Sequence, residues 1–127
     1  MRIRIYYEDT DAGGVVYNAS YLRFFERART EWLRDRGIDL KEWMDRDTLF
    51  VVSELGMKFL APAVYGDLLE MTTEITELKK ASLVFEHSAR ARGHEIVSGT
   101  TRLACIDRTG AIIRIPKEIR DVIGGKS

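Results

Sequence analysis

Cysteine, proline and net charge are all scarce in this sequence, and each shortage argues against a class of protein. The 127 residues contain one cysteine, Cys105, so internal disulfide bonds are excluded and a reducing compartment is favoured. There are two prolines and no Pro-, Gly- or Ser-rich linker, so residues 1–127 are expected to form one domain. Twenty basic residues balance twenty acidic ones, without the basic surplus that is typical of nucleic-acid binding.

Long hydrophobic runs are also missing. The opening MRIRIYYEDTDAGG has no apolar segment of the length that a signal peptide needs. No other run approaches the ~20 apolar residues of a membrane-spanning helix. We therefore expect a cytoplasmic protein that neither inserts into a membrane nor binds nucleic acid.

The hydrophobic pattern predicts one long helix among several strands. Residues 2–7 alternate as a strand does, and apolar residues at helical spacing then mark a helix over about 18–36. Its apolar stripe comprises Tyr21, Phe24, Phe25, Ala28 and Trp32. A short helix is expected at 40–44, strands near 49–60, 67–78, 81–92, 95–107 and 111–115, and a terminal helix from 116. This order predicts an α+β fold in which the long helix packs on a curved antiparallel sheet.

The opposite face of that sheet is expected to carry mixed apolar residues and to be covered by self-association. On the strand near 81–92, Leu83, Phe85, His87 and Ala89 share one face. His87 is therefore interpreted as a core or interface residue, and Cys105 as a small core residue rather than a nucleophile.

The sequence DTDAGG, within residues 8–14 (the acid–glycine loop), lies just before the long helix and has two interpretations. Asp11 is a good turn residue, because its carboxylate can accept hydrogen bonds from nearby amides. Alternatively, the bare backbone of Gly13 and Gly14 admits a ligand, and the helix N-terminus offers unpaired N–H groups. A carboxylate facing such amides is equipped to attack a carbonyl group. A calcium loop is disfavoured, because position twelve falls on Ala19 or Ser20, and the two histidines lack zinc spacing; no metal site is expected.

The stretch YYEDTDAGGVVYNASYLRFFERARTEWLR, residues 6–34, closely resembles the opening of hotdog-fold acyl-CoA thioesterases. The resemblance is to the bacterial branch encoded beside the Tol–Pal system and, more distantly, to 4-hydroxybenzoyl-CoA thioesterase. It extends to MKFLAPAVYGDLLEMTTEI and RLACIDRTGAIIRIPKEI. The resemblance implies a hotdog fold with a long central helix wrapped by five to six strands. It also implies dimers joined edge to edge, commonly tetramers, and hydrolysis of an acyl-CoA thioester without metal or organic cofactor.

Matched residue by residue, the resemblance places the catalytic aspartate at Asp11 and the amides that hold the thioester oxygen near Tyr17 and Asn18. Asn18 itself stands where this branch usually has histidine; it cannot act as a base but can orient water or substrate. Tyr7 matches a tyrosine often found near the carboxylate, with core packing as its alternative role. Gly14, Val15 and Tyr17 are expected to contact the substrate. The turn at Lys79 and Lys80 matches one that supplies basic contacts to coenzyme A phosphates.

Several alternatives stay open. Asp11 could act as nucleophile or general base. The domain could bind acyl-CoA without cleaving it, or hydrate an enoyl-CoA, although the latter usually pairs an aspartate with a nearby histidine. An acyl-carrier protein could supply the substrate in place of coenzyme A.

Overall fold

A computed structural model describes residues 1–124 of the chain. The helices are α1 (Ser20–Arg34), α2 (Leu40–Asp45) and α3 (Lys117–Gly124), and a single 3-10 turn, η1, covers Tyr7–Asp9. The strands are β1 (Arg2–Arg4), β2 (Leu49–Phe59), β3 (Leu68–Leu78), β4 (Ser82–Ala91) and β5 (His94–Ile106). The mixed α+β content expected from the sequence is therefore confirmed.

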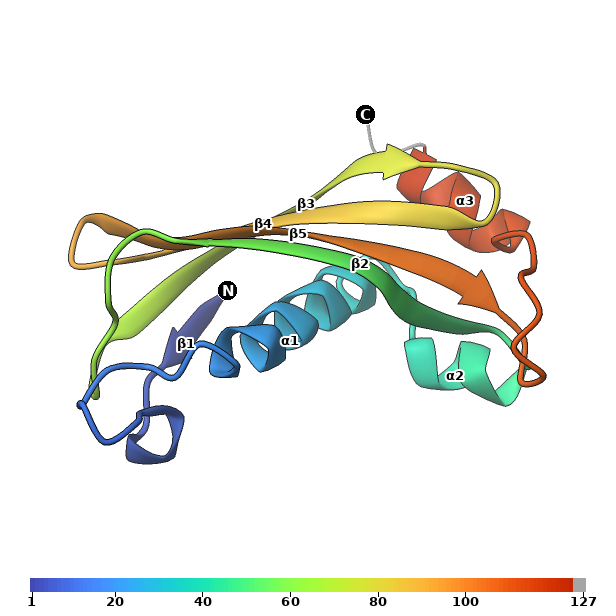
Figure 1. Cartoon of the computed structure of the whole chain (residues 1–127). Coiled ribbons are helices and arrows are strands. Elements are labelled where there is room, and N and C mark those ends of the chain that lie inside the picture. Colours follow the sequence, from blue (N-terminus) through green and yellow to red (C-terminus); the bar gives the residue numbers. More distant parts are fainter. Residues whose placement is uncertain (125–127) are drawn as a thin grey trace.

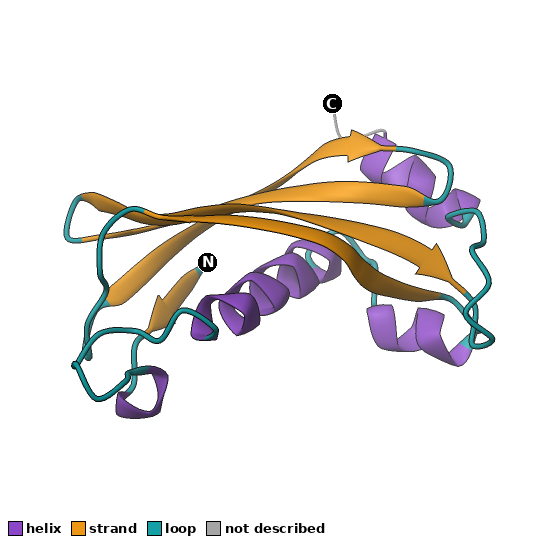
Figure 2. Cartoon of the chain, viewed as in Figure 1, coloured by secondary structure: helices purple, strands orange, loops and turns teal. Residues whose placement is uncertain are grey.

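The strands form one antiparallel sheet in the order β1-β3-β4-β5-β2. The sheet arches over α1, which lies against its concave face (Figure 1). Helix α2 lies beyond the end of α1, and α3 lies at the end of the sheet where β3 turns into β4 (Figure 2). The long helix and the curved sheet therefore form two layers with an apolar core between them.

The predicted stripe of α1 forms the centre of the core. Tyr21, Phe24, Phe25 and Ala28 are buried, and Trp32 packs edge-on against Phe85 of β4 with ring centroids 5.6 Å apart. Alternate residues of β4 face the same core, as the period-2 pattern predicted. Apolar burial between the helix and the sheet is what holds the two layers together.

Close approach of α1 to the sheet depends on a small residue in β5. A Cβ built at Gly99 would lie 2.6 Å from Cε2 of Phe25, a distance that real Cβ atoms do not show. The Phe25 ring therefore occupies the space that any side chain at position 99 would need.

Two element predictions differ from the structure. No strand forms at 111–115: Ile112 makes one isolated bridge to Ile106, and the Ile115 amide donates to Lys80 O in the β3–β4 turn. The segment therefore crosses the end of the sheet instead of joining it. At the other end, β1 stops at Arg4, and the chain then turns into η1.

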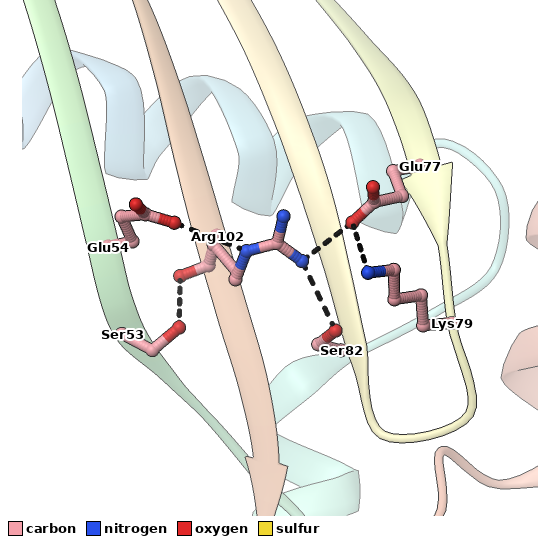
Figure 3. A network of polar contacts seen from close by, with 6 residues as sticks. All are labelled: Ser53, Glu54, Glu77, Lys79, Ser82 and Arg102. Carbon is pink, nitrogen blue, oxygen red and sulfur yellow. Dashed lines mark hydrogen bonds and ion pairs between the residues drawn. The ribbon is translucent and has the colours of Figure 1, made fainter.

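The outer face of the sheet carries both polar and apolar side chains, in line with the expectation: Val84 of β4 lies there between its cross-strand partners Glu77 of β3 and Arg102 of β5. Arg102 makes polar contacts on this face, because it donates to Glu77 of β3 at 2.6 Å and to Glu54 of β2 at 3.4 Å. These side chains lie on the sheet face opposite α1, where Arg102 reaches β2 on one side and, across β4, β3 on the other (Figure 3). Among residues 1–124, the large exposed apolar side chains of the sheet lie on β2.

Candidate active site

The acid–glycine loop closes as a tight turn on a short hydrogen-bonded stem. The Asp11 amide donates to Val15 O at 2.9 Å, and the Gly14 amide donates to Asp11 O at 3.0 Å. Thr10 and Val16 form an antiparallel bridge below the turn. Gly14 has a φ of +83°, a conformation that side-chain-bearing residues rarely adopt. The backbone on either side of Asp11 is therefore fixed.

Asp11 is exposed, and its Oδ1 accepts a hydrogen bond from the Gly13 amide at 2.8 Å. This contact is the turn role that the sequence offered as one interpretation. A Cβ at position 13 would lie 3.2 Å from the same oxygen, so glycine there keeps the carboxylate uncrowded. Oδ2 has no hydrogen-bond partner among the described residues. Asp11 can therefore keep its turn contact and still present one oxygen to a ligand.

The N-terminus of α1 offers two backbone amides without a hydrogen-bond partner in the described residues. The amides of Ser20, Tyr21 and Leu22 donate to the carbonyl groups three residues earlier. The amides of Asn18 and Ala19 have no hydrogen-bond partner within residues 1–124. They lie at the positive end of the helix dipole, where an oxygen that gains negative charge is stabilised.

Of the two amides expected to hold a thioester oxygen, the one at Tyr17 is already used. It donates to Asp9 O at 3.0 Å, whereas the Asn18 amide is unpaired in the described chain. The Asn18 side chain and the Tyr17 side chain are both exposed. The donors available to a ligand are therefore those of Asn18 and Ala19.

Asp9, which was not singled out in the sequence, is the buried acid of the loop. It is 6% exposed; its Oδ1 pairs with Arg23 of α1 at 3.1 Å, and its Oδ2 accepts from the Tyr6 amide at 2.8 Å. Its carbonyl oxygen accepts from Ser20 Oγ at 3.3 Å as well as from the Tyr17 amide. Three acids in four positions gave no signal of which would turn inward, since that choice depends on the position of Arg23 in three dimensions.

Tyr7 lies on the surface, so its alternative role in core packing is wrong. The residue is 78% exposed, and its ring meets that of Tyr65 edge to face with centroids 6.1 Å apart. The two rings border a depression of about 610 Å³. The depression is also lined by Arg4, Ile5, Tyr6, Glu8 and Gly66. An aromatic surface therefore adjoins the acid–glycine loop.

The expected substrate-binding residues lie in two separate places. Gly14 belongs to the acid–glycine loop, and Val15 and Tyr17 follow it closely in the chain. Val15 also forms an antiparallel bridge with Val64. Lys79 and Lys80 lie in the β3–β4 turn, whose backbone accepts hydrogen bonds from Arg120. That turn and the acid–glycine loop are at opposite ends of the sheet (Figure 1). Within a single chain, Lys79 and Lys80 are therefore far from Asp11.

His87 and Cys105 are core residues, as predicted. The His87 ring stacks on Phe25 at 4.6 Å, and its Nδ1 lies 3.2 Å from Thr73 Oγ1. Burial, with a smaller contribution from the charge of Arg29, lowers the His87 pKa to about 4. Burial raises the Cys105 pKa to about 11. The thiol is therefore protonated near neutral pH and is a poor nucleophile.

Within the described residues, no three His, Cys, Asp or Glu side chains are grouped so that they could hold a metal ion. None of the helices in residues 1–124 combines the length and the apolar character needed to cross a membrane.

Fold and loop together define a hotdog domain with a carboxylate turn beside the N-terminus of its central helix. The model of the thioesterase-like superfamily matches residues 6–123, and the chain belongs to this family. The acyl-CoA thioesterase YbgC of Haemophilus influenzae is 41% identical over 121 residues, which cover 93% of this chain and 88% of that protein.

Solved structures agree with this assignment. A hypothetical protein from Thermus thermophilus has a TM-score of 0.93 and 32% identity, with coverage of 100% of this chain and 98% of that one. A gentisyl-coenzyme A thioesterase has a TM-score of 0.90 and 28% identity, with coverage of 97% and 98%. The expected hotdog fold, with five strands in the sheet, is confirmed.

Proposed function

We propose that this protein hydrolyses acyl-CoA thioesters to the free acid and coenzyme A. The observation that carries the proposal is the hydrogen bond from the Tyr17 amide to Asp9 O. It holds the Asp11 turn beside the start of α1, while the next two amides, of Asn18 and Ala19, stay unpaired in the described chain. Family membership and the acyl-CoA thioesterase named among the relatives support the same chemistry.

In this mechanism the thioester oxygen accepts hydrogen bonds from the Asn18 and Ala19 amides. These donors stabilise the negative charge that develops when the carbonyl carbon becomes tetrahedral. A donor of this kind contributes roughly 2.7–4 kcal/mol when it is aimed in advance at the developing charge. Asn18 contributes its side chain as a hydrogen-bonding group that orients substrate or water, and it takes no part in proton transfer.

Asp11 acts in one of two ways. As a nucleophile, its carboxylate forms a bond to the carbonyl carbon, the C–S bond breaks, and the thiolate leaves; water then hydrolyses the mixed anhydride. As a general base, it takes a proton from water, which attacks the carbonyl carbon directly, and the thiolate again leaves. Both routes require the free Oδ2 of Asp11.

The complete site is an assembly of more than one chain, either a dimer or a tetramer. Lys79 and Lys80 lie at the far end of the sheet from Asp11, so any contact they make to coenzyme A phosphates comes from a neighbouring subunit. Tyr7, Gly14, Val15 and Tyr17 border the acyl end, next to the depression between Tyr7 and Tyr65. An acyl group presented on a carrier protein would reach the same carboxylate.

The proposal is tested by release of free thiol from a panel of acyl-CoAs, from short aliphatic to aromatic. The wild-type protein should cleave at least one of them, and Asp11→Asn should be slower by about 10²-fold or more. Asn keeps an oxygen for the Gly13 amide, so this variant isolates the chemistry from the turn. If acyl-CoA binds and no thiol appears, the protein is a binding domain. An Asp11→Asn variant as fast as wild type would contradict the role of Asp11.

A further inference from the structure

Two aspartates of this chain, both with little-exposed side chains, are held by the same kinds of contact. Asp9 Oδ2 accepts from the amide three residues before it, of Tyr6, at 2.8 Å, and Asp67 Oδ2 accepts from the amide of Val64 at 2.9 Å. Each pairs with one arginine, at 3.1 Å for Asp9 and 3.0 Å for Asp67, and each side chain is 8% exposed. Both arginines are about half exposed.

The two ion pairs differ in the structural element that carries the arginine. Asp67 pairs with Arg92, in the turn between β4 and β5, so that pair joins two loops of the sheet. Asp9 pairs with Arg23 on the first turns of α1, and Arg23 also donates to Ser20 Oγ at 3.1 Å. The Asp9 pair therefore joins the acid–glycine loop to the helix that offers the free amides.

The backbone of Asp9 makes the same connection a second time. Its carbonyl oxygen accepts from the Tyr17 amide at 3.0 Å and from Ser20 Oγ at 3.3 Å. Asp11 is two residues beyond Asp9, and Asn18 is one residue beyond Tyr17. At no more than ~3.6 Å of chain per residue, the carboxylate and the amides have little freedom to move relative to each other while these contacts hold.

Charge adds a second reason for the Asp9–Arg23 pair. The N-terminus of a helix attracts any nearby carboxylate. Because Asp9 Oδ1 pairs with Arg23 and Oδ2 accepts from the Tyr6 amide, neither oxygen is hydrogen-bonded to the Asn18 or Ala19 amide within residues 1–124. Asp11 is left as the exposed aspartate of the loop beside these two amides.

We propose that Asp9, acting with Arg23, is a positioning residue for thioester cleavage. It does not touch the substrate; it holds the Asp11 turn and the Asn18 and Ala19 amides in a single geometry. The inference rests on the hydrolysis proposed above. Displacement of a reacting group by about 1 Å can reduce a rate 10²-fold, so loosening this link should act mainly on kcat.

The test compares Asp9→Asn and Asp9→Ala with the matched variants Asp67→Asn and Asp67→Ala. For all four, kcat, KM and unfolding by denaturant are measured. Asp9→Ala should lower kcat about 10²-fold and Asp9→Asn about tenfold, with KM changed less than about threefold. The Asp67 variants should lose comparable stability and keep kcat within about threefold. If Asp9→Ala does not fold, Asp9→Asn, which keeps the shape of the side chain, carries the test.

A reciprocal variant checks that the arginine acts through the same link. Arg23→Met should lower kcat about as much as Asp9→Asn does, and the double variant should be little slower than either single variant. Full additivity of the two effects would overturn the pairing. If the Asp9 and Asp67 variants lost kcat equally, Asp9 would be a structural residue only. An Asp9→Ala variant with the kcat of the wild type would also overturn the inference.

Amide hydrogen exchange separates this inference from the proposed function. A wild-type protein that releases no thiol contradicts hydrolysis, and positioning is then judged from exchange alone. Asp9→Ala should speed exchange at the Tyr6 and Tyr17 amides about tenfold or more, whereas Asp67→Ala should leave the Tyr17 amide unchanged. Unchanged exchange at Tyr17 in Asp9→Ala would overturn the inference even if hydrolysis is observed.

Discussion

His87 is a titratable side chain enclosed between α1 and the sheet. Its Nε2 and the nearby Thr101 Oγ1 are buried without a hydrogen-bond partner among the described residues. With its pKa lowered from 6.5 to about 4, the folded protein binds this proton less readily than the unfolded chain does. The unfolded state therefore takes up the proton first as the pH falls, and His87 destabilises the fold in acid.

We expect this contribution to appear between pH 6.5 and pH 4. Above pH 6.5 the neutral ring costs nothing through protonation, and near pH 4 the loss should reach about 3 kcal/mol. Unfolding by denaturant at pH 4 to 8 measures it. His87→Gln should remove this part of the pH dependence, and His94→Gln, at an exposed position, should keep it. The same pH dependence in wild type and His87→Gln would contradict the assignment.

Individual side chains also show where the sequence is informative about the site and where it is not. Asp11 and its glycines could be identified, because the motif and the turn chemistry are local in sequence. Asp9 could not be distinguished from its neighbours, because its burial depends on the ion pair with Arg23, which lies on α1, 14 residues further along the chain. The use of the Tyr17 amide by Asp9 O is likewise a contact that no local pattern encodes.

At the scale of elements, the contact between α1 and β5 leaves no room for a side chain at position 99. A side chain at position 99 would meet Phe25 at 2.6 Å and the backbone oxygen of Gly56 at 2.8 Å. Gly99→Ala should therefore destabilise the protein by about 1–3 kcal/mol, since α1 must shift away from the sheet. Gly56→Ala is the matched control, because its Cβ would lie 3.4 Å from Thr100 Oγ1. Equal stability of the two variants would show that α1 moves freely.

Elements with a strong period were predicted well, and the short helices α2 and α3 and the strand β2 also formed where they were expected, whereas the strand at 111–115 did not. The stripe of α1 and the alternation of β4 each repeat over several turns or pairs of residues, so burial decides them. Residues 111–115 are apolar enough for a strand, yet the Ile115 amide pairs with Lys80 O in the β3–β4 turn. A one-dimensional pattern does not contain the position of that turn.

At the scale of the whole molecule, β2 is the long unprotected edge of the sheet. The other edge, β1, has 3 residues, whereas β2 has 11. Val51, Val52, Leu55 and Phe59 of β2 are exposed in the single chain. An open apolar edge of this kind favours pairing with another strand. Among the described strands, β2 thus carries the large exposed apolar side chains that favour self-association.

We therefore expect Val52→Lys to weaken self-association by about tenfold or more, because pairing of two β2 strands would bury the introduced lysine of each subunit close to that of its partner. Light scattering during size-exclusion chromatography measures the change from dimer or tetramer toward monomer. Val122→Lys, on α3, changes the same residue type at a comparable exposure and should keep the wild-type assembly. A wild-type protein that is already monomeric at micromolar concentration would contradict the role of β2.

The most direct test of the account is a crystal structure with a non-hydrolysable acyl-CoA analogue. We predict that the analogue's carbonyl oxygen lies about 3 Å from the Asn18 or Ala19 amide. We also predict that Asp11 Oδ2 lies about 3.5 Å or less from the carbonyl carbon, or contacts it through one water. An analogue bound with its carbonyl away from both amides, while Asp11 contacts only Gly13, would contradict the proposed mechanism.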